Sequence, residues 1–363
     1  MPFKYTEKAI PLLLAPESLD YHLAQGWYRM GGFIFTTHFL FFREQPYSAI
    51  WIRLGLEGHA FSKSQRKLMR RNAKLFDIAV HPIAIRREHE ELYQRYAADF
   101  DGILSPTIRD SLEHYDEEGT MYNTWMTEIR EKNSRRLVGY SFFDLGAEAS
   151  SSISGIFDPL LSSFSLGYYT MLLEIQYSVE NGLGYYYPGY VVPGYERFDY
   201  KLRIGSCDYL RVDTMDWEAF DWERVRTTAP VEVQRQKLEE VAGTLGKGGF
   251  PFHGPRIYPL FEAPLYDILT EDYFPYPLLI PLLKVGGDFW LVLAFDPQTR
   301  QYFVCSCAHM TQRQSFFDAG YLNGFSPDRY FTELLSINEI LLQTADGQVA
   351  AAACLRLLTT NFD

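Results

Sequence analysis

Three consecutive tyrosines, Tyr185 to Tyr187, are followed by a Pro-Gly pair and a fourth tyrosine, Tyr190. A strand that only fills a core usually carries Val, Ile or Leu, so a run of phenols suggests a further role. A phenol hydroxyl donates hydrogen bonds to carbonyl oxygens, and its ring stacks on nucleobases. In a regular strand, Tyr186 and Tyr190 share one face. We therefore expect these two side chains to line a cleft; the alternative is that the whole run fills a core.

A second candidate site is a cluster of cations in the stretch SKSQRKLMRRNAKL, which begins at Ser62. It contains six basic residues and no acidic one: Lys63, Arg66, Lys67, Arg70, Arg71 and Lys74. Ser62 and Gln65 have the spacing of a capping box, which predicts that a helix begins here. The spacing places four of the cations on one helical face, and Met69, Ala73 and Phe76 on an apolar face. A helix that is only solvated usually mixes charge signs, so we expect this one to bind a phosphate backbone.

A serine-rich loop before a helical pattern is the third candidate. Ser163 or Ser165 suits the N-cap of this helix, whose first turn contains Leu166 and Gly167. Unpaired backbone N–H groups at a helix start can hold a phosphate or an oxyanion. Residues 158–170 lack the glycine spacing of an acyl-CoA pyrophosphate loop, so coenzyme A is not expected.

The composition indicates a soluble protein of a reducing compartment. The chain has 363 residues, of which 47% are apolar, which is enough for two or three domains. Its four cysteines are too few for the disulfide framework of a secreted protein, and no stretch reaches the ~20 apolar residues that span a bilayer. The net charge of −12 argues against indiscriminate binding to nucleic acid or anionic lipid. We expect a cytoplasmic protein that meets any polyanion through its basic patch.

Three regions must position the candidate residues, and we place them at residues 1–77, 78–229 and 230–363. The first carries strand patterns and the basic helix. The second alternates strands with helices, including a helix from Leu166 to a stop at Gly182 and then the tyrosine strand. The third begins with a charged helix, continues with a hairpin and closes with a pair of helical patterns.

The order of strand, loop, helix and tyrosine strand resembles the central βαβ unit of GNAT-type acyltransferases. In that fold two neighbouring strands splay apart at an irregularity, and the gap admits an acyl donor. Pro188 cannot donate to a sheet ladder and Gly189 permits unusual backbone angles, so both residues suit such a break. We therefore expect an α/β (α+β) fold, in which a GNAT-like mixed sheet with splayed central strands carries N-terminal and C-terminal accessory regions.

Several collinear stretches resemble the arginyl-tRNA protein transferases and their leucyl-transferring bacterial relatives. They are AQGWYRMGGFIF, FSKSQRKLMRRN, VGYSFFDL and, most similar, FDPLLSSFSLGYYTMLLEIQYSVENGLGYYYPGYVV, which is followed by FDYKLRI. The resemblance covers the chain from Ala24 to Asp213 and ends before Pro230. Members of this family usually carry a Cys-rich segment near the N-terminus, whereas the first cysteine here is Cys207.

The resemblance implies an enzyme that moves arginine or leucine from aminoacyl-tRNA to the N-terminal amine of a protein or peptide with an acidic first residue. It implies two partners, the aminoacyl-tRNA and the acceptor N-terminus, with no membrane and no DNA. An aminoacyl ester is already activated, so neither a cofactor nor a metal is expected, and the site must hold the ester near an unprotonated amine. The alternatives are a non-catalytic module that binds a tRNA end or a peptide terminus, and a GNAT enzyme with another acyl donor.

The resemblance also suggests roles for single residues. Asp158, at the end of a strand, would orient or deprotonate the incoming amine, unless it only opens a turn. Lys201 and Arg203 lie two apart, on one face of an expected strand, and would bind the acidic acceptor unless they only protect a sheet edge. Arg29 is a further candidate for acceptor binding. The tyrosine pair and the serine-rich loop would hold the donor end and the oxyanion.

One rival site lies in the C-terminal region. Cys305, Cys307 and His309 alternate along an expected strand, and thiolate with imidazole is a plausible zinc set. Because a fourth ligand and paired cysteine motifs are missing, we interpret this strand as one packed with small thiols.

Overall fold

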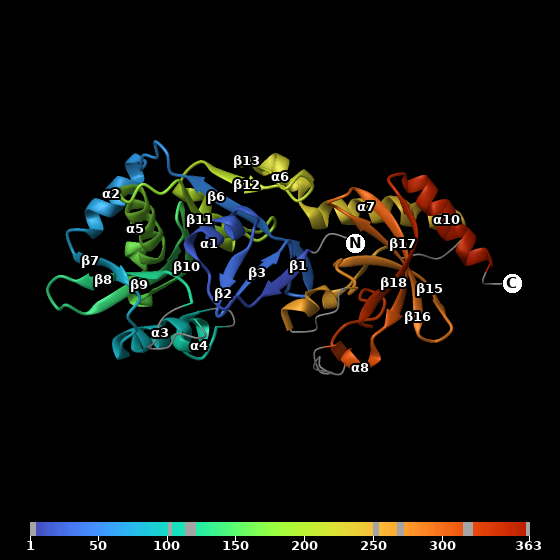
Figure 1. The fold of residues 1–363 in the computed structure, drawn as a ribbon, viewed down its shortest axis with the longest axis horizontal. Coiled ribbons are helices and arrows are strands. Elements are labelled where there is room, and N and C mark those ends of the chain that lie inside the picture. The colour runs from blue at the N-terminus through green and yellow to red at the C-terminus, as the bar shows by residue number, and fades with distance from the viewer. Residues whose placement is uncertain are drawn as a thin grey trace.

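The computed structural model describes residues 5–100, 104–112, 121–249, 254–266, 272–314 and 322–360. Two lobes lie end to end along the longest axis of the molecule, and the N-terminal and central regions share one of them (Figure 1). No helix in the described ranges is long and apolar enough to cross a membrane.

An eight-stranded mixed sheet forms the centre of the larger lobe. Its spatial order is β13 (Trp217–Ala219), β12 (Cys207–Leu210), β6 (Ile50–Gly55), β11 (Tyr185–Val191), β10 (Ala149–Phe157), β9 (Leu137–Leu145), β8 (Thr124–Glu131) and β7 (Phe76–Pro82). Only β10 and β11 pair in parallel, and the other neighbours are antiparallel. Strand β6 enters this sheet from the region before residue 78. The sheet and its helices confirm the expected α/β (α+β) class.

The parallel pair separates soon after it forms. β10 and β11 are paired at only three positions, from Ala149 with Tyr185 to Ser151 with Tyr187. Beyond these pairs, β11 changes register against β6 between Tyr186 and Gly189, on either side of the proline. Proline cannot donate to a ladder, which explains why the pairing stops here. The splay that the sequence predicted at this point is confirmed.

Helices cover both faces of the sheet. Helix α5 (Leu166–Glu180) joins β10 to β11, and α3 (Arg87–Asp99) packs with α4 (Ile108–Leu112). The hydroxyl of Tyr140 in β9 donates to a carbonyl of α3, whereas the next residue, Ser141, faces α5. Because successive strand residues point to opposite faces, α3 and α5 lie on opposite sides of the sheet. The basic helix α2 (Lys63–Asn72) lies beside α5 (Figure 1).

Small elements from the N-terminal region complete this lobe. They are α1 (Pro16–Ala24), the three-stranded sheet β1 (Thr6–Ala9), β3 (Phe33–Thr37) and β2 (Tyr28–Met30), and the hairpin β4 (Phe39–Phe42) with β5 (Gln45–Ser48). The described ranges also contain three 3-10 helices: η1 (Pro159–Phe164), η2 (Glu196–Ile204) and η3 (Pro259–Tyr266).

The second lobe contains a five-stranded sheet and two long helices. The strands, in order, are β14 (Arg256–Ile257), β15 (Leu278–Val285), β16 (Phe289–Asp296), β17 (Gln301–His309) and β18 (Leu335–Thr344), with helices α7 (Pro230–Lys247), α8 (Thr311–Gln314) and α10 (Gly347–Thr360). Helix α6 (Trp222–Thr228) precedes α7 and packs Val225 into the core of the larger lobe (Figure 1). The charged helix and the hairpin are confirmed. The prediction of two closing helices is correct for one of them: α10 is helical, but the other segment is the strand β18, which pairs with β17. Sheet pairing overrides its weak helical pattern.

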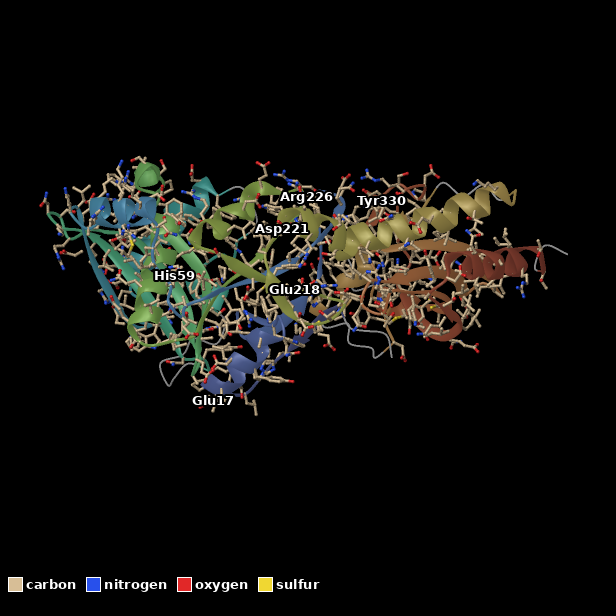
Figure 2. The ribbon with its side chains drawn as sticks, turned by 90° about the horizontal axis from the view of Figure 1, so that it is seen from above. Glu17, His59, Glu218, Asp221, Arg226 and Tyr330 are labelled. Carbon is tan, nitrogen blue, oxygen red and sulfur yellow. The ribbon has the colours of Figure 1, made fainter. Side chains whose placement is uncertain are left out.

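The two lobes share a hydrophobic core. Tyr5 and Phe39 are fully buried in the same cluster as the C-terminal sheet, and the hydroxyl of Ser48 donates to Glu232 of α7 over 2.7 Å. Tyr330, which Figure 2 shows where the lobes meet, donates to the carbonyl of Glu44 over 2.9 Å. The C-terminal lobe is therefore packed onto the N-terminal strands rather than tethered to them.

Candidate functional site

A cavity of about 630 Å³ opens where β10 and β11 separate. β10 contributes Ser152, Ser154 and Gly155 to its wall, and β11 contributes Pro188. The start of α5, the C-terminal end of α3 and η2 complete the lining. A gap between splayed parallel strands is therefore open to a ligand, and a helix start and a cationic segment face it.

Helix α5 directs its N-terminus at the cavity. Its N-cap, Ser165, has left-handed backbone angles (φ 51°, ψ 47°), and the cavity is lined by Ser165, Leu166 and Gly167. A Cβ on Gly167 would lie 2.9 Å from the ring of Phe157, so only glycine permits this close approach of the helix start to β10. The first N–H groups of a helix have no intrahelical partner, and they favour a negative charge. This end of the cavity suits an oxyanion or a phosphate.

The 3-10 helix η2, which packs against α5, adds cations and a phenol to the cavity wall. Arg197, Tyr200 and Lys201 line the cavity. Burial lowers the pKa of Lys201 to about 8, and its Nζ donates to the carbonyl of Tyr190 over 3.1 Å. Burial raises the pKa of Tyr200 to about 12, so its hydroxyl keeps its proton at neutral pH. The cavity wall therefore offers positive charge and a hydrogen-bond donor in addition to the helix start.

The basic helix has the capping box that the sequence predicted. Ser62 accepts from the N–H of Gln65, and the Gln65 side chain accepts from the N–H of Ser62. All six basic side chains are exposed, and none of them is paired with a carboxylate among the residues that the structure describes. The expected apolar face is partly wrong: Met69 and Phe76 do pack inward, but Ala73 is exposed, and the fully packed helix positions are polar ones.

Those buried polar positions connect the basic helix to the cavity rim. The amide of Gln65 donates to the hydroxyl of Tyr168 over 3.1 Å and to the carbonyls of Arg203 and Ile204 over 2.9 Å. Asn72 donates to the carbonyl of Phe164 over 3.0 Å. These bonds tie α2 to η1, to α5 and to η2, which all border the cavity. A ligand held on α2 is therefore held in a fixed position relative to the cavity.

A second hollow, of about 420 Å³, lies between α2 and the C-terminal half of α5. Arg66 and Arg70 line it together with the rings of His59 and Phe61. Figure 2 shows His59 in the larger lobe, away from the junction of the lobes. Gln176, Val179 and Glu180 of α5 form the other side of this hollow, so its two cations come from α2 alone.

The tyrosine pair does not lie as expected. Tyr186 is fully buried, and its hydroxyl donates to Oε2 of Glu174 over 2.7 Å. Tyr190 belongs to a different cluster, where its ring contacts Trp51 edge-on. The register shift between Tyr186 and Gly189 interrupts the alternation of the strand, so the expectation of a shared cleft face is wrong.

Two other expected site residues have structural partners instead. The carboxylate of Asp158 accepts from the N–H of Leu160 and pairs with Arg136, and it does not line the cavity. Asp158 therefore caps η1, as the turn interpretation predicted. Arg29 is buried in an ion pair with Asp144 at 3.1 Å, with its guanidinium over the ring of Tyr122. It lies outside the cavity lining.

Of the expected site residues Lys201, Arg203 and Ser163, one lines the cavity and two do not. Lys201 lines the cavity, but Arg203 is exposed and stacks on Tyr168. Their assignment to one strand face is wrong, because both lie in the 3-10 helix η2, which follows a turn at residues 193–194. Ser163 is not in the cavity wall, and its carbonyl accepts from Arg71 over 3.1 Å.

The rival zinc set is part of a packed strand. Cys305 and Cys307 are buried in β17, where burial raises both thiol pKa values, and His309 contacts Gln314. In the described part of the chain, no group of three or more His, Cys, Asp or Glu side chains could hold a metal ion.

The sequence interpretation missed three polar groups at or near the cavity. Arg197 and Tyr200 precede the lysine that was found, but η2 was read as a strand, which places alternate residues on opposite faces. Glu174 is buried beneath the cavity. The sequence pattern that could have pointed to Glu174 is a single acid in the apolar run TMLLEI. Such a pattern is uncommon because an ionised carboxylate is costly to bury.

Comparison with known proteins identifies similar chains. Residues 88–211 match the family described as "Arginine-tRNA-protein transferase, C terminus". A protein from Helicobacter hepaticus named "Aspartate/glutamate leucyltransferase" is 30% identical over 205 residues, which cover 55% of this chain and 82% of that protein. A protein of the same name from Ruegeria pomeroyi is 32% identical over 43% of this chain and 57% of its own length. Another from Marinobacter nauticus is 27% identical over 52% of this chain and 77% of its own length. Among solved structures, FemX has a TM-score of 0.33 and 11% identity over 53% of this chain and 65% of that chain, a likeness too distant to bear on function.

Proposed function

Because this chain belongs to the family of arginine-tRNA-protein transferases and aspartate/glutamate leucyltransferases, which are aminoacyltransferases, we propose that it transfers leucine from leucyl-tRNA to the N-terminal amine of proteins that begin with Asp or Glu. The similar proteins named aspartate/glutamate leucyltransferases support this choice of donor and acceptor. The observation that carries it is the hydrogen-bonded connection between a cationic helix and a cavity between splayed strands.

The basic helix α2 supplies the tRNA contact in this proposal. Its six exposed cations face solvent without carboxylate partners in the described chain, and exposed Lys and Arg are the groups that bind phosphates. The second hollow extends this surface with Arg66 and Arg70 beside two aromatic rings. Since Gln65 and Asn72 fix α2 to the cavity rim, tRNA bound on the helix directs its aminoacyl end to the cavity.

The transfer itself needs positioning more than reactive groups. The acceptor amine attacks the ester carbonyl carbon, the carbonyl oxygen becomes an oxyanion, and the ribose oxygen then leaves. The N–H groups at the start of α5 suit the oxyanion, because preorganised donors stabilise developing charge. Lys201 and Arg197, which also line the cavity, suit the carboxylate of an acidic first residue.

A non-catalytic module that binds a tRNA end or a peptide terminus is the second candidate. The same cations and cavity would serve it, so only turnover distinguishes the two. A single-turnover assay with leucyl-tRNA and arginyl-tRNA, each offered to peptides that begin with Asp, Glu or Ala, makes this distinction. We expect transfer of leucine to the Asp and Glu peptides alone. Binding of tRNA without transfer from either donor would contradict the enzyme and favour the binding module.

A further inference from the structure

Glu174 is a carboxyl group buried in the middle of α5, with no exposed surface. The hydroxyl of Tyr186 donates to its Oε2 over 2.7 Å. The hydroxyls of Ser141 in β9 and Ser152 in β10 also lie close to the carboxyl group, but Oε1 of Glu174 has no hydrogen-bond partner among the described residues. Within the described chain, no Lys, Arg or His side chain forms an ion pair with it. A carboxylate without a cation is costly to bury, so this group calls for an explanation.

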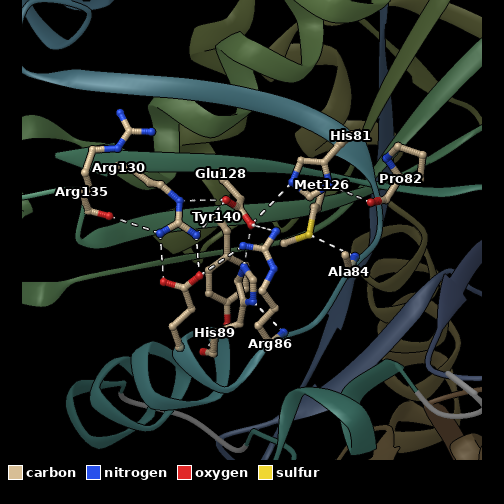
Figure 3. A network of polar contacts seen from close by, with 11 residues as sticks. His81, Pro82, Ala84, Arg86, His89, Met126, Glu128, Arg130, Arg135 and Tyr140 are labelled. Carbon is tan, nitrogen blue, oxygen red and sulfur yellow. Dashed lines mark hydrogen bonds and ion pairs between the residues drawn. The ribbon is translucent and has the colours of Figure 1, made fainter. Parts of the chain in front are cut away.

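Glu128, in strand β8 of the eight-stranded sheet, is a buried acid with a contrasting set of partners (Figure 3). Its side chain is also buried, but its carboxylate contacts His89 at 3.0 Å, Arg130 at 2.9 Å and Arg86 at 3.5 Å. Burial alone would raise its pKa, but the hydrogen bonds from His89 and Arg130 lower the pKa to about 2. Glu128 is therefore ionised throughout the neutral range. Among the described residues, the side-chain groups that lie close enough to hydrogen-bond Glu174 are hydroxyls, and burial raises the pKa of Glu174 to about 7.

The titratable groups that face Glu174 are phenols. Tyr186 of β11 donates to it, and Tyr200 of η2 is close enough for the two groups to influence each other electrostatically. Burial raises the pKa of Tyr186 well above its ordinary value and the pKa of Tyr200 to about 12, so both phenols keep their protons at neutral pH. Any proton that moves in this cluster near pH 7 is therefore the proton of Glu174.

Ser152 connects this carboxyl group to the cavity. Its hydroxyl lies close to both Glu174 and Tyr186, and the residue also lines the cavity. Strand β10 shifts register between Ser152 and Ser154, immediately after its last pair with β11. The register shift therefore places a hydroxyl between the buried acid and the point where the strands splay. Asp158, the acid expected from the sequence, has no such access because it caps η1 and pairs with Arg136.

We propose that Glu174, acting through the hydroxyl of Ser152, accepts the proton that the incoming N-terminal ammonium must lose before it attacks the aminoacyl ester. This inference rests on the proposed transferase function. The ammonium gives one proton to the oxygen of Ser152, which passes its own proton to the Glu174 carboxylate. The free amine then forms the C–N bond, the C–O bond to the ribose breaks, and the second amine proton leaves with the ribose oxygen. Glu174 does not touch the substrate and is a positioning residue in this scheme.

Glu174→Gln tests the proposal, because glutamine keeps the size of the side chain and cannot accept the proton. Single-turnover transfer is measured from pH 5.5 to 9 at saturating tRNA and peptide. For the parent we expect the rate to rise with pH, with an apparent pKa near 7. For the variant we expect a rate at least tenfold lower at neutral pH, whose remaining pH dependence reflects only the ionisation of the peptide amine. Tight binding of tRNA should be unchanged. A variant with the parent's rate and pH profile would overturn the proposal.

Three further variants keep the test decisive if Glu174→Gln fails to fold. Ser152→Ala should lower the rate in the same way, since it removes the connecting hydroxyl. Tyr186→Phe removes a hydrogen bond that lowers the pKa of Glu174, so it should move the midpoint of the profile to higher pH. Ser178→Ala is the matched control, because this buried hydroxyl lies one turn further along α5 and bonds to Ser150 and to the carbonyl of Glu174. Parent profiles in both Ser152→Ala and Tyr186→Phe would reject the relay, whereas an inactive parent would reject the proposed function itself.

Discussion

Lys201 and Glu174 are both ionisable groups whose pKa values are shifted by burial. Lys201 lines the cavity, whereas Glu174 does not. Lys201 reaches the cavity and carries a charge that its surroundings disfavour, whereas Glu174 lies beneath the wall and exchanges its proton near neutral pH. Groups with strongly shifted pKa values cluster at functional sites because catalysis needs a proton or a charge at a set position. The two residues therefore give separate predictions.

Lys201→Met should separate stability from function. Burial lowers the pKa of this lysine, so the folded protein binds fewer protons than the unfolded chain between about pH 8 and 10.4, and the parent gains stability as pH rises through that window. At pH 7 the methionine variant should have an equal or higher melting temperature. If Lys201 binds the acidic first residue, KM for an Asp-start peptide should rise at least tenfold. A lower melting temperature with unchanged KM would show that the lysine is structural.

Glu174 should make the protein less stable as pH rises. Its folded pKa of about 7 is above the ordinary value of a glutamate, so the folded state binds more protons between about pH 4.5 and 7, and stability is lost across that range. A shift of this size corresponds to about 3 kcal/mol. Urea unfolding at pH 5 and 7.5 should therefore show that Glu174→Gln loses less stability than the parent. Parallel pH dependences in the two proteins would contradict the raised pKa.

At the scale of the elements, α2 carries the proposed tRNA contacts, and β10 and β11 form the proposed cavity for the aminoacyl end. α2 presents cations outward and polar anchors inward, and β10 with β11 forms the gap that α5 faces. The hydrogen bonds from Gln65 and Asn72 make this one unit, since they add to the apolar contacts that Leu68 and Met69 make with the core.

Charge reversal on α2 should weaken RNA binding without unfolding the helix. Replacing Arg66, Lys67 and Arg70 with Glu should lower affinity for tRNA and reduce the salt dependence of binding by ~1 unit of slope per lost phosphate contact. These side chains are exposed, so the melting temperature should change little. Filter binding at several salt concentrations measures both quantities. Arg87→Glu with Arg95→Glu, exposed on α3, is the matched control, and an equal loss in the control would remove α2 from the interface.

Local patterns predicted the elements better than they predicted the faces of the elements. The capping box at Ser62 and the strand, helix and strand around α5 follow from neighbouring residues, and they are correct. The positions of Tyr186 and Tyr190 depend on a register shift against β6, a strand more than 100 residues away in the chain, which no local pattern contains. For Asp158 the local Asp-Pro pattern gave the turn interpretation that the structure supports, and only its ion pair with Arg136 depends on another strand.

At the scale of the whole molecule, the C-terminal lobe is packed onto the strands that begin the chain. Phe39 is fully buried, with its ring 4.5 Å from that of Tyr5 and 5.9 Å from that of Phe261. The family match at residues 88–211 ends before this lobe begins. Since the shared core joins the lobes, we expect them to unfold together.

Phe39→Ala should destabilise both lobes at once. Deleting a buried phenylalanine ring usually costs about 3–5 kcal/mol, because it removes apolar contacts and leaves a cavity. Chemical unfolding followed by fluorescence and by circular dichroism should give one coincident transition at a lower midpoint. Phe289→Ala, a partly exposed phenylalanine in β16, is the control and should change stability much less. Two separate transitions in the parent would show that the shared core does not couple the lobes.

The central claim is that the cavity between β10 and β11 holds the aminoacyl end of tRNA. The most direct test is photocrosslinking with tRNA that carries a photoreactive group on its terminal adenosine, followed by mass spectrometry of the labelled peptides. We predict adducts on the cavity wall, on the start of α5 and on η2, and their loss when leucyl-tRNA competes. Adducts confined to the C-terminal lobe, or an unchanged yield with competitor, would contradict the claim.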